Sequence, residues 1–216
     1  MGGGLTIETG QMVSMNSGGG FCVMDFLGTG EQTVTGQAEI VFNGTSSNSF
    51  VRANSGTLVV DEGMVIRSGT QGGQVGQLGS VKNKGTIASR TNGKTVTVAS
   101  NGGWTSEATG TLEASGGGTL TLNNAWTNAG SLVVNNGTLN LGGTFLSTSI
   151  DPTLWTRTGG TVNLTGTMNN AGQTFTLNAQ TGSMVLAGGT IVGGTLATSD
   201  GAAFTALQNS SGTLTG

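Results

Sequence analysis

The sequence predicts an all-β chain that folds as a right-handed parallel β-helix, or β-solenoid, with about 23 residues per coil and a roughly triangular cross-section. The first observation behind this prediction is composition: glycine makes up 42 of 216 residues, charged residues 8% and apolar residues 34%. Abundant valine, leucine and threonine with one proline favour short strands joined by tight turns over disorder. The other two observations are an internal repeat and an alternation of polar and apolar residues between the turns.

A triplet of glycine, threonine or serine, and an apolar residue marks the repeat. Four of its glycines are each 23 residues apart: Gly143, Gly166, Gly189 and Gly212. Longer segments share one layout of apolar residue, polar run, small turn residue and threonine or serine, namely 50–63, 81–93, 104–115, 126–136 and 168–182. A period in this range is typical of solenoids.

Short alternating segments lie between the turns. They are 95–98, 119–122, 138–141, 161–164 and 174–177. A period of two over four residues predicts strands rather than helices. About three strands per unit form one coil, and roughly nine coils give a rod on the order of 40 Å long. We expect a single cooperative domain, because each coil buries its core only against its neighbours.

Two parts depart from the regular pattern. Residues 1–49 are predicted to form irregular N-terminal coils or a cap, continuous with the regular solenoid of residues 50–216. Segment 151–159 contains the only proline and is predicted to be a protruding or distorted turn.

Stacked coils place equivalent inward side chains in ladders about 4.8 Å apart. The first predicted ladder is Val96, Leu120, Leu139, Val162 and Met184. The second is Phe50, Val81, Trp104, Trp126, Phe145, Met168, Ile191 and Leu214. The third is Leu58, Ile87, Leu112, Leu132, Leu154, Phe175 and Leu196. Trp104 is expected to stack on Trp126.

Several functional classes are disfavoured. The net charge is −3 and the seven basic residues are scattered, so no nucleic-acid partner is expected. No apolar run approaches the ~18 residues that cross a bilayer, so no membrane insertion is expected. With no histidine and one cysteine, neither a zinc site nor an intrachain disulfide is expected, and Cys22 is predicted to be a small core residue. Calcium-binding and nucleotide-binding motifs find no match, so no cofactor is expected.

Outward positions of the alternating segments supply a candidate binding face. Its residues are Thr95, Thr97, Thr119, Thr121, Thr138, Asn140, Thr161 and Asn163. Threonine arrays on flat solenoid faces resemble the ice-binding faces of some β-helical antifreeze proteins, and polysaccharide is the other ligand considered. The plainer interpretation is that threonine has high β-propensity and suits a solvated face.

Sugar-cleaving enzymes also use this architecture, and they need a pair of carboxylates across the scissile bond. Two pairs were considered: Glu107 with Glu113, and Asp61 with Glu62, which Arg67 follows. Solvated turn charges are the simpler interpretation of both pairs, so the chain is not predicted to be an enzyme.

The units "GGTVNLTGTMNNAGQTFTLNAQTG" and "WTNAGSLVVNNGTLNLGG" resemble repeats of very large secreted bacterial proteins. These are the β-solenoid regions of autotransporter-like and filamentous-haemagglutinin-like adhesins, and the resemblance is closest to the giant repeat proteins of planctomycete-type bacteria. It covers residues 50–216 well and the rest poorly, and it carries no catalytic residues to transfer.

The resemblance implies a long extracellular rod that displays or adheres. We therefore expect a structural role in a bacterial adhesin, surface fibre or matrix filament, outside the cell or at its surface. No signal peptide is visible at the N-terminus, so an extracellular chain would be a mature piece or an excised fragment. Self-association through the ends or edges of the solenoid is expected, since open strand edges pair readily.

Overall fold

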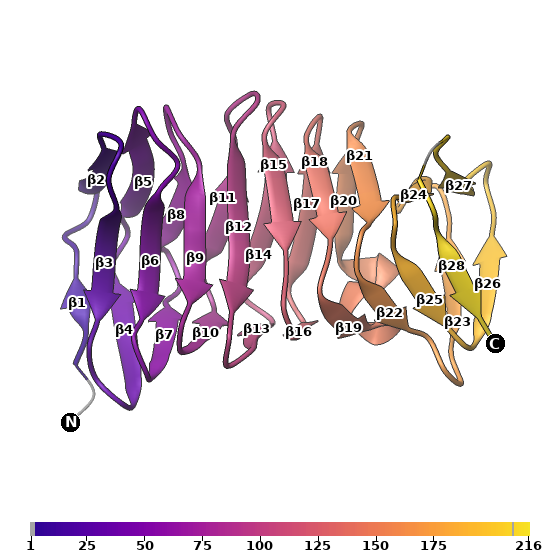
Figure 1. The fold of residues 1–216 in the computed structure, drawn as a ribbon, viewed down its shortest axis with the longest axis horizontal. Coiled ribbons are helices and arrows are strands. Elements are labelled where there is room, and N and C mark those ends of the chain that lie inside the picture. Colours follow the sequence, from indigo (N-terminus) through magenta and orange to yellow (C-terminus); the bar gives the residue numbers. More distant parts are fainter. Residues whose placement is uncertain (1–2, 209) are drawn as a thin grey trace.

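A computed structural model describes residues 3–208 and 210–216, and it shows an all-β parallel solenoid (Figure 1). Each coil contributes one strand to each side of the molecule, and strands of successive coils pair in parallel. The chain advances along one axis, with its two ends at opposite ends of the rod. The predicted fold class and coil length of about 23 residues are therefore confirmed. Right-handedness and the triangular outline stay predictions.

The strands of the described residues fall into five sheets. Sheet A contains β1 (Leu5–Thr6), β4 (Glu31–Thr35), β7 (Thr57–Val60), β10 (Ser80–Asn83), β13 (Trp104–Ser106) and β16 (Trp126–Asn128). Sheet D contains β19 (Thr144–Leu146), β22 (Thr167–Asn169), β25 (Thr190–Val192) and β28 (Thr213–Thr215).

Sheet B contains β2 (Met12–Ser17), β5 (Glu39–Gly44), β8 (Val65–Ser68), β11 (Thr86–Ser89), β14 (Thr111–Ser115), β17 (Ser131–Asn135) and β20 (Trp155–Thr158). Sheet E contains β23 (Thr174–Leu177) and β26 (Thr195–Thr198). Sheet C contains β3 (Cys22–Phe26), β6 (Ser49–Ala53), β9 (Gly73–Gln77), β12 (Thr95–Ser100), β15 (Thr119–Leu122), β18 (Thr138–Leu141), β21 (Thr161–Leu164), β24 (Met184–Leu186) and β27 (Phe204–Ala206).

The strands of residues 3–49 join the same sheets as the later strands. Leu5 pairs with Val34 and Met12 pairs with Glu39, so the first coil spans 27–29 residues. Thr57 pairs with Ser80, a spacing of 23. The longer first coil accounts for the weak repeat signal at the N-terminus. The assignment of residues 1–49 to a cap stays a prediction.

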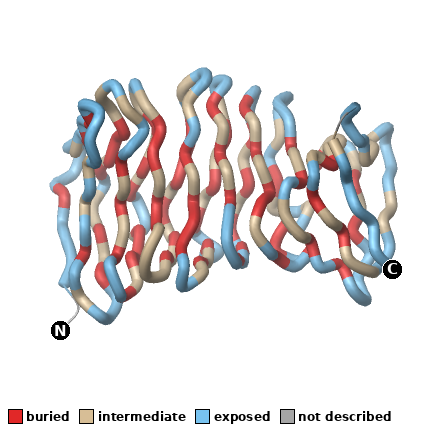
Figure 2. Tube along the Cα trace, viewed as in Figure 1, coloured by how far each residue is buried: buried red, intermediate tan, exposed pale blue. Residues whose placement is uncertain are grey.

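The core is a continuous column of apolar side chains inside the coils, and buried positions alternate with less buried ones along many strands, such as β15 and β18 (Figure 2). The first predicted ladder is confirmed: strand register aligns its members, all at most 1% exposed. The stack of Trp104 on Trp126 is also confirmed, with ring centroids 5.4 Å apart, and Phe145 continues it at 4.3 Å.

Three ladder assignments are wrong. Phe50 pairs with Gln74 on sheet C, at an outward position, and not on sheet A. Leu58 pairs with Val81, so it belongs to the second ladder and not the third. Trp155 pairs with Leu132 where Leu154 was expected. The first two errors arise because coils of unequal length shift the alignment, and the third arises from the insertion described next.

Segment 151–159 begins in a distorted turn, as predicted. Two short 3₁₀ helices, η1 (Ser147–Ile150) and η2 (Pro152–Leu154), separate β19 from β20. Asp151 caps η2 by accepting a hydrogen bond of 2.8 Å from the Thr153 amide, and Pro152 occupies the first helical position, where it fits best. The insertion lies between the first strand of sheet D, β19, and the last strand of sheet B, β20, whereas sheet C continues past it (Figure 1).

Candidate binding face

The eight predicted face residues all lie on sheet C, in four consecutive coils. Register places them in two columns. Thr95, Thr119, Thr138 and Thr161 form the first, and Thr97, Thr121, Asn140 and Asn163 form the second. All eight are exposed or half-buried, and they alternate with buried residues of the same strands. The structure thus brings the predicted residues together on one surface.

Hydrogen bonds tie part of the second column together. The Asn140 amide donates to the Thr121 hydroxyl at 3.2 Å, and the Asn163 amide donates to Asn140 Oδ1 at 2.9 Å. The amide groups run along the axis at the coil spacing, which keeps their orientation uniform. These bonds stabilise the stack and also arrange donors and acceptors on the surface.

A further column of threonines lies on sheet D and was not predicted. Register aligns Thr144, Thr167, Thr190 and Thr213. The signal for this column was present in the sequence, because each of these residues directly follows one of the glycines spaced by 23 residues.

The charged residues concentrate in the first half of the chain. After residue 115 the only charged residues in the sequence are Asp151, Arg157 and Asp200. The columns on sheet C and the threonine column on sheet D therefore lie mainly on uncharged coils. In the first half, four ion pairs join different coils: Asp25–Arg52, Glu31–Lys82, Glu39–Arg67 and Glu113–Arg90. These pairs bridge stacked strands and so act as contacts between coils.

Two of the four acidic residues that are candidates for catalysis, Glu113 and Asp61, accept hydrogen bonds from neighbouring side chains. The Glu113 carboxylate accepts hydrogen bonds from Arg90 at 2.7 Å and from Ser115 at 2.6 Å. Burial, the largest single influence, raises the pKa of Glu113, but the hydrogen bonds from Arg90 and Ser115 and the positive charge of Arg90 together outweigh it, so the pKa lies below the ordinary value of 4.5. Asp61 accepts from the Thr35 hydroxyl at 2.9 Å, and Arg67 bonds Glu39 rather than Asp61 or Glu62. Glu107 lies exposed between β13 and β14.

An apolar cavity of about 320 Å³ lies against the ladder where sheet A gives way to sheet D. It is lined by Trp104, Trp126, Phe145 and Leu146 together with threonines and Asn169. The three aromatic rings are each only 3% exposed, and Leu146 is 50% exposed. The two indole N–H groups donate to the backbone oxygens of Asn123 and Gly142, so these rings serve the core.

No protein-family model, curated protein or solved structure matches the chain. Within residues 3–208 and 210–216, no helix has the length and hydropathy to cross a membrane. The same residues hold no group of three or more metal-ligating side chains. Cys22 is half-buried and packs against the edge of the core.

Proposed function

We propose that the chain is a structural rod: a segment of a bacterial extracellular or cell-surface adhesin, fibre or matrix filament that acts without catalysis. The stack of in-register parallel coils around one unbroken apolar core supports this proposal most strongly. Such a stack is stiff because each inner coil shares backbone hydrogen bonds with the coils before and after it. The resemblance of its repeats to those of giant secreted adhesins agrees with this role.

Self-association of the rod through its ends is part of the proposal. Strand β28 lies at one edge of sheet D and exposes 61% of Leu214, and β2 lies at the edge of sheet B and exposes 54% of Met12. Figure 1 shows these edges at opposite ends of the molecule. Unpaired parallel edges with apolar side chains are templates for further strands, and the best geometric match is another coil of the same kind.

Electron microscopy of the purified chain across a range of concentrations tests the assembly. We expect elongated particles that lengthen with concentration. The Leu214→Lys variant should shorten them, because it places a charge in the interface between coils. The Leu146→Lys variant is a matched control on the side of the rod and should leave their length unchanged. Uniform single particles at every concentration would count against the assembly.

A second candidate function is binding of polysaccharide or ice by the threonine and asparagine columns of sheet C. The register of eight such residues over four coils favours it. Thermal hysteresis measurements and a glycan array test the two ligands separately. Replacing Thr97 and Thr121 by lysine should abolish a positive signal, whereas the same change at Thr144 and Thr167 should preserve it. No signal in either assay would dismiss this function.

A further inference from the structure

The break between sheets B and E leaves an open strand edge toward the C-terminal end of the rod. Within the described residues, β20 pairs only with β17 and β23 pairs only with β26. The edge of β23 that faces the preceding coil, which contains β20, therefore has no strand partner. Elsewhere on this side of the molecule, from β2 to β20, each strand pairs with the strand of the next coil.

The backbone groups that face the break follow from the hydrogen bonds on the other side of β23. The Gln173 oxygen accepts from the Thr195 amide and the Leu177 oxygen from the Ser199 amide, both at 2.9 Å. Backbone groups of alternate residues point to opposite edges of a strand. The amide and carbonyl groups of Thr174 and Thr176 therefore point into the break.

Side chains bridge one end of the break. Gln180 Nε2 donates to the Trp155 oxygen at 2.9 Å, and the Arg157 guanidinium donates to the Thr181 and Ser183 oxygens, both at 2.6 Å. Burial lowers the pKa of Arg157 from its ordinary value. These contacts hold coil to coil near residues 178–183 and leave the edge at residues 173–176 uncovered.

The uncovered end is a cleft with a single negative charge. A cavity of about 240 Å³ lies between β23 and the two 3₁₀ helices, and it is lined by Ser147, Thr148, Asp151, Pro152, Gln173, Thr174, Phe175 and Thr176. Asp151 Oδ1 accepts from the Thr153 amide and hydroxyl, both at 2.8 Å, and the side chain is exposed. The nearest cation along the chain, Arg157, is directed to backbone oxygens instead.

We propose that this cleft binds an extended peptide segment, which adds to the free edge of β23 and places a lysine or arginine beside Asp151. Donors and acceptors that alternate along a strand edge are matched by another extended backbone, and peptides commonly bind sheets in this way. The lone carboxylate selects a basic side chain, because a neutral one leaves its charge uncompensated.

The test uses the full chain labelled with ¹⁵N and the probe peptide acetyl-Thr-Val-Lys-Val-Thr-amide. We expect the amide signals of Thr174 and Thr176 to shift on titration and their hydrogen exchange to slow. A control peptide with N-methylated valines lacks the edge donors, and its affinity should fall about tenfold or more. Shifts confined to the terminal strands β1, β2 or β28, equal binding of the methylated peptide, or no binding would each overturn the proposal.

The charge requirement has its own pair of controls. The Asp151→Asn variant retains a good helix cap, so the fold should be preserved. The variant should bind the lysine peptide several-fold more weakly than the native chain does. Both proteins should bind a peptide with norleucine in place of lysine with the same affinity. An equal loss for both peptides, or no loss for either, would overturn the assignment of Asp151.

Discussion

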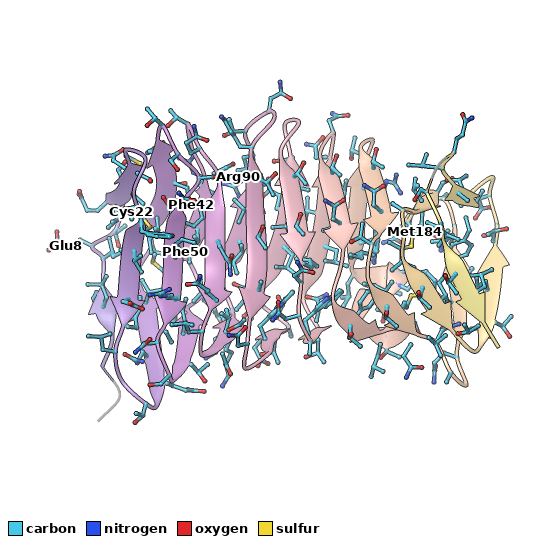
Figure 3. The ribbon with its side chains drawn as sticks, in the orientation of Figure 1. Glu8, Cys22, Phe42, Phe50, Arg90 and Met184 are labelled. Atoms are coloured by element: carbon cyan, nitrogen blue, oxygen red, sulfur yellow. The ribbon has the colours of Figure 1, made fainter. Side chains whose placement is uncertain are left out.

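At the scale of single residues, the molecule depends on pairs that repeat from one coil to the next. The ring of Trp126 lies between Trp104 and Phe145, and each tryptophan donates its N–H to a backbone oxygen. The ion pairs of the first half follow the same principle, since each joins different coils. Figure 3 labels Arg90, which forms one of these ion pairs, and shows Phe42 and Phe50 nearer the N-terminal end of the rod. A residue in this fold acts mainly through its equivalents one coil away.

The Glu113–Arg90 pair predicts a specific pH dependence. Because the folded pKa of Glu113 lies below 4.5, its contribution to stability is complete above that pH and is lost as the pH falls through the folded pKa. The Glu113→Gln variant should therefore have a lower free energy of unfolding than the native chain. This difference should be largest near neutral pH and should disappear in acid. Urea unfolding between neutral and acidic pH measures the difference.

The Glu62→Gln variant is the control for this comparison, since Glu62 is exposed in a turn. Its difference from the native chain should be small at each pH. A Glu113→Gln difference that stays constant across the pH range would contradict the prediction.

At the scale of elements, glycines decide where a strand of one coil lies close to the next. Gly143 precedes β19 with φ of +62°, and a Cβ there would lie 1.9 Å from the Asn124 oxygen. Gly172 has a similar φ of +71°, but no atom lies within 4 Å of its added Cβ. Gly143 is therefore constrained both by its backbone conformation and by its contact with the neighbouring coil, whereas Gly172 is constrained only by its conformation.

These two glycines predict different costs for the same change. Gly172→Ala should lower the free energy of unfolding by about 1–2 kcal/mol, the cost of a left-handed backbone. Gly143→Ala should cost about 4 kcal/mol or more, since the backbone of β19 must also shift. Chemical denaturation of both variants measures this, and equal costs would contradict the structural distinction.

At the scale of the whole molecule, stability depends on position along the rod. Inward residues of the central coils are fully buried, as Leu141 is, whereas Leu214 in the terminal strand is 61% exposed. Figure 2 shows exposed segments at both ends of the rod and in the turns between strands. A coil with one neighbour forms half the contacts between coils, so opening should begin at the ends.

Hydrogen exchange should follow this gradient, slowest in β12, β15 and β18 and fastest in β27 and β28. Leu141→Ala should cost about 2–5 kcal/mol, and Leu214→Ala less than about 1 kcal/mol. Both are measured at dilutions where sedimentation shows single chains, since assembly would bury Leu214. Uniform protection along the rod would contradict the prediction.

The repeat allowed much of the fold and the candidate face to be predicted. Glycine spacing, polar–apolar alternation and apolar ladders are local patterns in the sequence. They were therefore sufficient to predict the parallel coils, the inward-facing side chains between residues 95 and 141, and the eight residues of the candidate face. The predicted ladder positions of Phe50, Leu58 and Leu154 were wrong. Coil length varies or helices are inserted near these residues, and a single sequence does not show where the extra residues lie.

The sequence by itself determined that the chain stacks on itself, since its short alternating segments bury their apolar residues only against copies of the same pattern. Only the tertiary structure decided where the stack is interrupted. The helices after β19 line one cavity with β23, and β20 of the preceding coil does not pair with β23. The open edge and Asp151 meet there because strands distant in sequence are adjacent in the solenoid, which no local pattern encodes.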